Sequence, residues 1–218
     1  MARTFSDVHT GRVIHDSPAI RVRRRPGRPR GGQHVVDRQL VLEAAERAIR
    51  RDGPGVSLET IALEAGVTKP IVYARVGGRT ELGNALAQRM ADRITTAVAG
   101  AITDQPQGRE SLVAFIRTNL ETVAADRDLF LYVTGGTADE SPMRALYLAG
   151  RSAAPLAEQL AAWRTAQGLD PVVAIPWAYG IIGMLNLVSL WWIEEADRPA
   201  GELAEQLTEL LWSGFDAP

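Results

Sequence analysis

The chain has 218 residues, of which 46% are apolar and 23% are charged. A chain of this length and composition is expected to fold around a substantial core, and the absence of cysteine excludes disulfides, thiolate metal sites and a cysteine nucleophile. The formal net charge is −2, but residues 1–80 carry 15 basic and 8 acidic side chains, whereas residues 81–218 carry 9 and 18. This split indicates a polyanionic partner at the N-terminal end only.

The first predicted unit is an arginine-rich arm at residues 1–35. It shows no helical or strand period, contains several prolines and glycines, and has no apolar segment typical of a secretory signal. We expect the arm to be disordered and the protein to be cytoplasmic. Arg28 and Arg30, in the extended Arg25–Arg30 stretch, are candidates for the minor groove of DNA, where arginine meets an enhanced negative potential. The alternative role for the arm is that of a solubilising tail.

Three helices are predicted next, because apolar residues recur at helical spacing after Asp37. Ser57 and Thr68 can cap the second and third helices, and Gly66 between them can adopt the left-handed conformation of a tight turn. These two helices have the spacing of a helix-turn-helix unit, whose second helix enters the major groove by its N-terminal end. The first helix is expected to end at Asp52–Gly55, the second to cover 58–65 and the third to end at Gly77–Gly78.

The N-terminal end of the third helix carries side chains suited to DNA. Thr68 and the free N–H groups of the first turn can bind a phosphate. Lys69 can reach a guanine edge or a phosphate, and Pro70 and Ile71 offer apolar surface to a thymine methyl group. The alternative, an ordinary helical hairpin, is disfavoured by the basic arm nearby. Further along the chain, where contacts with the phosphate backbone are expected, lie Tyr73, Arg75 and Arg79.

The acidic remainder is predicted to be helical as well. A fourth helix starts at Thr80, with Glu81 in its first turn, and no long alternating strand pattern follows. We therefore predict an all-α protein. The further helices are expected at about 109–124, 126–133, 142–150, 152–167, 171–195 and 200–214.

One of these helices contains Val172–Ile193, a run of 22 residues without a formal charge. It is long enough to span a bilayer, but Pro176, Asn186 and its acidic flanks argue against a membrane segment. A helix that is apolar on all sides is otherwise buried in protein.

No catalytic set is found along the chain. The three histidines, His9, His15 and His34, lie in the arm region, where a disordered segment preorganises no metal site. There is no phosphate-binding glycine motif and no nucleophile elbow. We expect no enzymatic activity, no cofactor and no metal.

Residues 39–82 combine small residues, glycines and helix caps with a few apolar and aromatic positions. These residues are Ala44, Ala45, Gly53, Ser57, Ile61, Ala62, Ala65–Thr68, Pro70, Tyr73, Glu81 and Leu82. With this set, the stretch resembles the N-terminal domain of the TetR family of bacterial transcriptional regulators. The acidic remainder resembles the family only in size, helical character and helix order. The resemblance implies a homodimer that binds a near-palindromic operator, and a helical C-terminal domain whose small-molecule effector releases the DNA.

Two features of the chain depart from the family pattern. After the recognition helix, the family's aromatic residue, small polar pair and lysine are replaced by Val76-Gly77-Gly78-Arg79. Glu59 stands where some members place a base-reading basic residue, and we expect it to face solvent. The resemblance implies phosphate contacts for Ser57, Thr68, Tyr73 and Arg79, and recognition-helix roles for Lys69, Pro70, Ile71 and Arg75.

The resemblance also implies that the last two long helices form a four-helix dimer interface. Gly180 and Gly183 could permit close helix approach, or they could simply pack in the core. The dimer-interface candidates are Gly180, Gly183, Leu187, Trp191, Leu203, Leu207, Leu210 and Leu211.

Candidate effector-binding residues are aromatic side chains of the acidic part and one amide, although aromatic residues at helical spacing are more often core. A buried Asn186 needs a hydrogen-bond partner, either a ligand or a mate across a dimer. The few basic residues of this part favour an apolar or cationic effector over a polyanionic one. The candidates are Phe115, Phe130, Tyr147, Trp163, Trp177 and Asn186.

These observations predict a disordered arm at 1–35, a helix-turn-helix DNA-binding domain at 36–81 and a helical effector-binding and dimerisation domain at 82–218. The leading hypothesis is a ligand-responsive repressor that binds a palindromic operator as a dimer and has no membrane partner. The alternative is an architectural or membrane-attached DNA-binding protein without a soluble effector.

Overall fold

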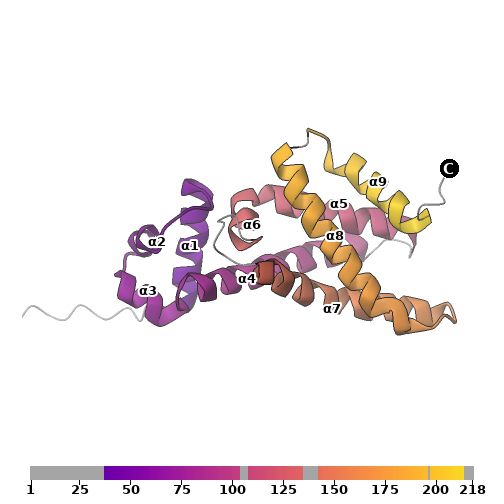
Figure 1. The fold of residues 1–218 in the computed structure, drawn as a ribbon, viewed down its shortest axis with the longest axis horizontal. Helices are drawn as coiled ribbons and strands as arrows, with labels where there is room; N and C mark the ends of the chain where they lie inside the picture. The colour runs from indigo at the N-terminus through magenta and orange to yellow at the C-terminus, as the bar shows by residue number, and fades with distance from the viewer. Residues whose placement is uncertain (1–36, 104–107, 135–141, 196, 214–218) are drawn as a thin grey trace, which may run out of the picture. The chain divides into compact units, whose positions relative to one another are not determined.

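The computed structural model describes residues 37–103, 108–134, 142–195 and 197–213, which contain helices and short turns but no strand (Figure 1). This confirms the predicted all-α class. The arm, with Arg28 and Arg30, lies outside the described residues. The helices are α1 (Arg38–Asp52), α2 (Leu58–Glu64), α3 (Lys69–Val76), α4 (Arg79–Ile102), α5 (Arg109–Ala125), α6 (Arg127–Thr134), α7 (Pro142–Ala166), the 3₁₀ turn η1 (Pro171–Val173), α8 (Ala174–Glu195) and α9 (Ala200–Ser213).

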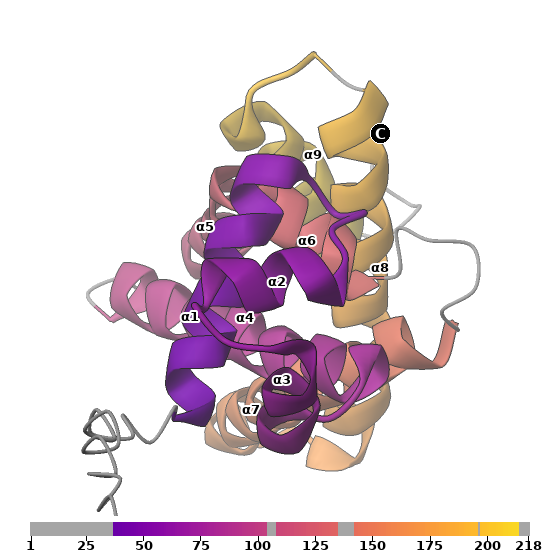
Figure 2. The ribbon, with the colours of Figure 1, turned by 90° about the vertical axis from the view of Figure 1, so that its left-hand side faces the viewer.

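The first three helices form a small unit around a shared apolar core (Figure 2). Ile61 of α2 and Val72 of α3 are fully buried against the apolar face of α1. Gly66 has a φ of +67°, as the predicted tight turn requires. The hydroxyl of Ser57 accepts the N–H of Thr60 at 3.1 Å, which confirms Ser57 as the cap of α2. The second and third helices are therefore joined as a helix-turn-helix.

Helix α4 leaves this unit and continues into the rest of the chain. Its first turn is capped by the Glu81 carboxylate, which accepts the N–H of Gly78 at 2.8 Å. Leu82 and Leu86 are buried in the same apolar cluster as α1–α3, and so are Leu129 and Phe130 of α6. One continuous core thus holds the helix-turn-helix, the first half of α4 and α6 together.

A buried carboxylate network crosses the same junction. Glu46 of α1 lies 3.1 Å from Arg89 and 3.2 Å from Arg93, both on α4. Arg50 of α1 bridges Glu46 at 3.1 Å and Asp126, between α5 and α6, at 2.7 Å. Because an unpaired charge is costly in the interior, these ion pairs restrain α1 against α4 and the α5–α6 turn.

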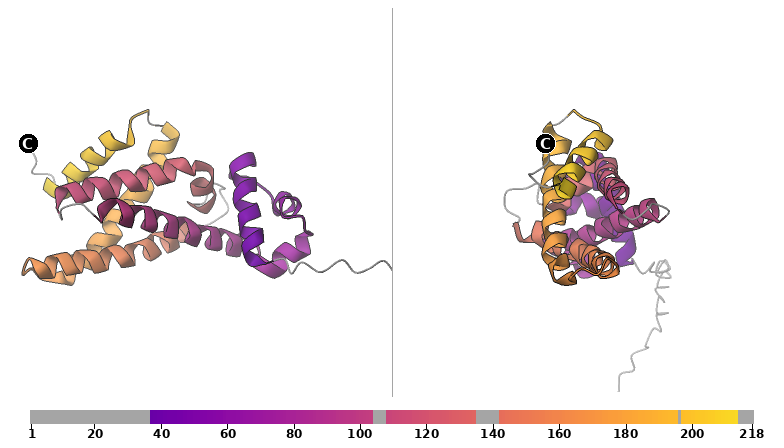
Figure 3. Two further views of the ribbon diagram at one scale, coloured as in Figure 1. Left: turned by 180° about the vertical axis from the view of Figure 1, so that it is seen from behind. Right: turned by 90° about the vertical axis from the view of Figure 1, so that its right-hand side faces the viewer.

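In the rest of the chain, α5 packs against both α4 and α9, and α7 packs against α8 (Figure 3). The prediction of two helices at 142–150 and 152–167 was wrong, because α7 is continuous from Pro142 to Ala166 and contains Pro155. A proline in a helix removes one hydrogen bond, but contact with α8 stabilises the helix on both sides of it.

Replacing Gly77 with alanine is expected to destabilise the fold by about 1–3 kcal/mol. Gly77 has a φ of +79°, and an added Cβ would lie 2.7 Å from the Cβ of Glu81. Urea unfolding of the variant and the parent chain measures the difference.

The matched control is Gly100→Ala, inside α4, where an added Cβ meets nothing within 4 Å. It is expected to stabilise the helix by about 0.5–1 kcal/mol. Midpoints that shift in the same direction for both variants would contradict this account of Gly77.

Candidate nucleic-acid interface and ligand cavity

The N-terminal end of α3 presents its side chains to solvent. Thr68 is the residue before α3, and its hydroxyl makes no capping bond to the helix backbone. Pro70 is the second residue of the helix, where its missing N–H costs little. The exposed residues on and beside α3 include five DNA-contact candidates: Thr68, Pro70, Ile71, Tyr73 and Arg75.

Ser57 is exposed at the start of α2. Its hydroxyl caps α2 and also lies 3.0 Å from the hydroxyl of Thr60. The first turns of α2 and α3 each bring backbone N–H groups to a helix N-terminus, which is a favourable place for a phosphate. Together they form the candidate nucleic-acid interface.

Lys69 forms an ion pair with Glu59 of α2. The hydrogen bond between them raises the pKa of Lys69 and lowers the pKa of Glu59, so both groups stay charged at neutral pH. Glu59 is exposed, as expected, but it is also a partner of the cation that we assigned to base reading. Sequence spacing could not indicate this pair, because the two residues are on different helices.

Arg79, like Lys69, is partly buried. Its Nη1 donates a hydrogen bond to the carbonyl of Val56 at 3.0 Å, and Val56 is the residue before Ser57, the cap of α2. Its guanidinium group also lies over the ring of Tyr132, a residue of α6, at 5.4 Å from the ring centroid. A phosphate contact for Arg79 stays a prediction, whereas its contacts with α6 and with the residue before α2 were not foreseen.

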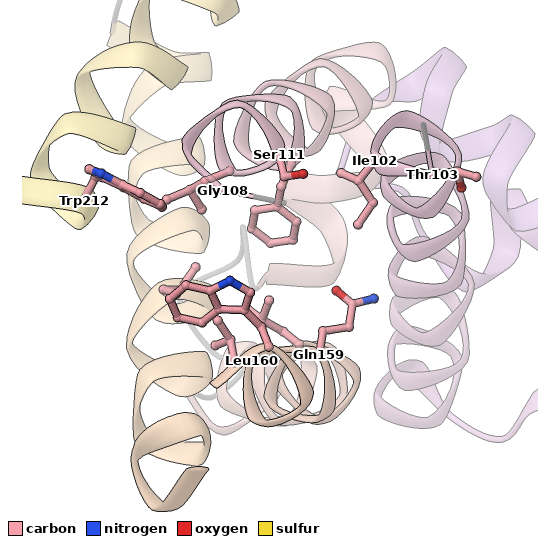
Figure 4. Close-up of a pocket in the computed structure, with 12 residues that line it drawn as sticks. Ile102, Thr103, Gly108, Ser111, Gln159, Leu160 and Trp212 are labelled. Atoms are coloured by element: carbon pink, nitrogen blue, oxygen red, sulfur yellow. The ribbon is translucent and has the colours of Figure 1, made fainter. Parts of the chain in front are cut away.

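A cavity of about 320 Å³ lies between α4, α5, α7, α8 and α9 (Figure 4). Trp212 borders it from α9, Ile102 from the last turn of α4, and Leu160 from α7. None of its lining residues carries a charge. The lining consists of Ile102, Thr103, Gly108, Ser111, Leu112, Phe115, Leu156, Gln159, Leu160, Trp163, Ile181 and Trp212.

A second cavity, of about 560 Å³, shares part of this lining. Leu112, Leu160, Trp163, Ile181 and Trp212 border both cavities, so the two are neighbours. The residues found only in the second are Pro176, Trp177, Gly180 and Leu211.

The structure brings three of the six effector candidates to these cavities. Phe115 lines the first, Trp177 lines the second, and Trp163 lines both. Phe130 lies instead in the core that holds the helix-turn-helix, because α6 packs against α1 and α4. Asn186 is partly buried on α8 and borders neither cavity, and the side chain of Tyr147 lies outside the described residues.

Several cavity residues were not among the sequence candidates. Ile102 is the last residue of α4 and Thr103 follows it, while Ser111 and Leu112 lie in the first turn of α5. The break between these two amphipathic helices was therefore the sequence signal that could have identified these cavity residues. Trp212, at the end of the apolar face of α9, was a second such signal.

Helix α8 carries an apolar ridge that the described residues leave exposed. Ile175, Tyr179, Leu187 and Trp191 are all exposed, and Leu187 is 70% exposed. Successive side chains of this group lie one or two helical turns apart, and Gly183 occupies the position between Tyr179 and Leu187. An added Cβ at Gly183 would meet nothing within 4 Å, so this glycine opens onto the ridge, and Gly180, which borders the second cavity, is equally open. This set is called the α8 ridge below.

The dimer-interface candidates divide into two groups. Gly180, Gly183, Leu187 and Trp191 are exposed on α8, and Leu210 is exposed on α9. Leu203 and Leu207 are buried against α5 in the chain's own core, and Leu211 is partly buried beside them. The apolar face of α9 therefore faces mainly inward, which its helical period could not distinguish from a face toward a partner.

Among the described residues, the segment Pro171–Glu195 is long and apolar enough to cross a membrane. An 18-residue stretch of this segment has a mean hydropathy of 1.7, and 28% of that stretch lies buried within the chain. No group of three metal-ligating side chains occurs in the described part of the chain.

Comparison with known proteins assigns the family. Residues 97–217 match the model of the tetracyclin repressor-like C-terminal domain. An uncharacterized HTH-type transcriptional regulator of Mycobacterium tuberculosis, MT0489, is 30% identical over 203 residues, covering 91% of this chain and 86% of that protein.

Solved structures show the same fold. FadR from Bacillus subtilis in complex with stearoyl-CoA has a TM-score of 0.61 at 19% identity, covering 81% of this chain and 98% of that one. AibR in complex with isovaleryl coenzyme A and operator DNA has a TM-score of 0.55 at 20% identity, covering 82% and 99%. The helix-turn-helix, the helical C-terminal part and the family match agree: the chain belongs to the TetR family of transcriptional regulators.

Proposed function

We propose that this regulator is a repressor that binds a two-fold operator as a homodimer and is released by a small-molecule effector whose cavity-bound part is apolar. The observation that carries the proposal is the placement of α4. Its first residue contacts Val56, next to the helix-turn-helix, and its last residue lines the 320 Å³ cavity. A ligand in that cavity would therefore contact a helix that is continuous with the DNA-binding unit.

DNA docking is proposed to follow the exposed end of α3. Ser57, Thr68 and Tyr73 would contact phosphates, while Lys69 would reach a base edge after leaving Glu59. Pro70, Ile71 and Arg75 would complete the contact surface. The basic arm, including Arg28 and Arg30, would add contacts in the minor groove. In this proposal residues 36–81 bind DNA and residues 82–218 bind the effector and the second subunit.

The effector is proposed to be an acyl thioester. Two relatives of the same fold were solved with acyl-CoA ligands, one with a long chain and one with a short branched chain. A cavity lined by apolar and neutral polar side chains suits the acyl part of such a ligand. The polyanionic CoA part would have to remain outside it, because no cation lines the cavity.

The homodimer is proposed to form through the α8 ridge and Leu210. Side chains at i, i+4 spacing make the kind of ridge that packs into the grooves of a second helix. Burying this ridge would also account for the apolar character of Pro171–Glu195 without a membrane. We accordingly propose that the protein acts in the cytoplasm.

Tyr73→Ala is expected to weaken binding to all DNA sequences about 10-fold, because it would remove a phosphate contact, whereas Lys69→Ala should relax base preference by about 1–3 kcal/mol. Operator sequences selected from a random pool provide the ligand, and titrations against the operator and a scrambled duplex give both values. Tyr73→Ala binding as tightly as the parent would refute this docking.

Leu160→Trp is expected to raise the stearoyl-CoA concentration for half-release of DNA at least about 10-fold, because the larger ring would fill the cavity lined by Leu160. Operator affinity without ligand should be unchanged. Leu169→Trp, at an exposed position that lines neither cavity, is the control. An unchanged response of Leu160→Trp to both stearoyl-CoA and isovaleryl-CoA would count against this effector site.

Leu187→Asp is expected to convert the dimer to a monomer, because it would place a charge in the middle of the α8 ridge. Sedimentation equilibrium measures the mass. Leu63→Asp is the matched control, since Leu63 is also highly exposed, at 80%, but lies on α2. A parent chain that sediments as a monomer, or a dimeric Leu187→Asp variant, would reject this interface.

A further inference from the structure

We propose that Arg79 is a positioning residue, which links α6 to the N-terminus of α2 and thereby sets the DNA-contact geometry of the helix-turn-helix. This inference rests on the DNA-binding function proposed above. It departs from the role implied by the family resemblance, in which Arg79 is a phosphate contact.

The first step of the argument is the bond to Val56. Arg79 is the first residue of α4, and its Nη1 donates to the Val56 carbonyl at 3.0 Å. Val56 is buried and immediately precedes Ser57, whose hydroxyl caps α2. A displaced guanidinium would therefore release the backbone that holds the N-terminus of α2, where Ser57 is proposed to meet a phosphate.

The second step is the cation–π contact with Tyr132 of α6. The Arg79 guanidinium lies 5.4 Å from the centroid of the Tyr132 ring, and the Tyr132 side chain is only 4% exposed. A cation over an aromatic face is stabilised more strongly when both groups are partly removed from water. The contact with Tyr132 therefore helps to hold the guanidinium in the position from which it bonds to Val56.

The third step is that the start of α6 is also tied to the DNA-binding unit. Asp126, the residue before α6, pairs with Arg50 of α1 at 2.7 Å. Tyr132, near the end of α6, contacts Arg79. Helix α6 thus holds both the first helix of the DNA-binding unit and, through Arg79, the residue that precedes α2.

The free protein gives the first test. In Tyr132→Leu, the amides of Thr60 and Ile61, which bond to Ser57, are expected to exchange hydrogen at least about three-fold faster. Tyr132→Phe retains the ring and should exchange like the parent. Arg79→Gln, at a partly exposed position, should reproduce the faster exchange without removing a core side chain. Unchanged exchange in both Tyr132→Leu and Arg79→Gln would overturn the proposal.

DNA titration over a series of KCl concentrations gives the second test. Arg79→Gln and Tyr132→Leu are each expected to weaken operator binding about 3- to 10-fold while the salt dependence stays near that of the parent. The double variant should be no weaker than either single variant. Arg75→Gln, at an exposed cation of α3, is the comparison and should reduce the salt slope by about 0.9.

The opposite pattern would overturn the inference: a slope reduced by about 0.9 in Arg79→Gln, together with parent-like binding by Tyr132→Leu, would make Arg79 a phosphate contact. Failure of the parent chain to select any operator would instead refute the proposed function. The exchange measurement would still decide the positioning role, because it uses no DNA.

Discussion

The buried carboxylate of Glu46 is the constraint on which the arrangement of the DNA-binding helices depends. It is 5% exposed and faces three arginines, one on its own helix α1 and two on α4. Removing such a carboxylate from its partners would leave a charge in a poorly solvated site, at a cost of several kcal/mol. Helix α1 therefore cannot rotate away from α4 without a large penalty.

Arginine suits this network better than lysine would. Its planar group presents several N–H donors in fixed directions, so one side chain can bridge two carboxylates. Arg50 does this between Glu46 and Asp126, and Arg93 lies within 3.4 Å of both as well. The charge pairs act together with the apolar core of α1, α4 and α6, which supplies most of the buried surface. Charge and packing thus restrain the same junction.

Much of the fold could be predicted because its signals are local. The cap at Ser57 and the glycine at Gly66 follow from the chemistry of one turn each, so the helix-turn-helix was predictable. Thr68 precedes α3 as expected, but its hydroxyl does not make the capping bond that the sequence predicts. The failures concern contacts between helices. Phe130 and Leu203 are apolar residues at helical spacing, and such spacing does not reveal whether a side chain meets a ligand, a partner or the chain's own core.

The same limit applies to the candidate site. The sequence predicts that Lys69 reads DNA, but its pair with Glu59 depends on how α2 and α3 cross. Arg79 was recognised as a cation near the recognition helix, but its contact with Tyr132 joins residues more than fifty positions apart. Aromatic residues such as Trp163 do line a cavity, and their role in effector binding stays a prediction. The small and polar residues of the lining carry no signal of their own in the sequence.

The ion pair of Lys69 has a consequence for the covalent chemistry of the protein. Lys69 is the only lysine in the chain, and there is no cysteine. An amine-reactive reagent therefore has a single side-chain target, at the start of α3. Only the neutral amine is nucleophilic, and the bond to Glu59 raises the pKa of Lys69, so acylation there is slower than at a free lysine. The rate of that one reaction reports directly on whether Lys69 is held by Glu59, released into solvent or covered by a bound duplex.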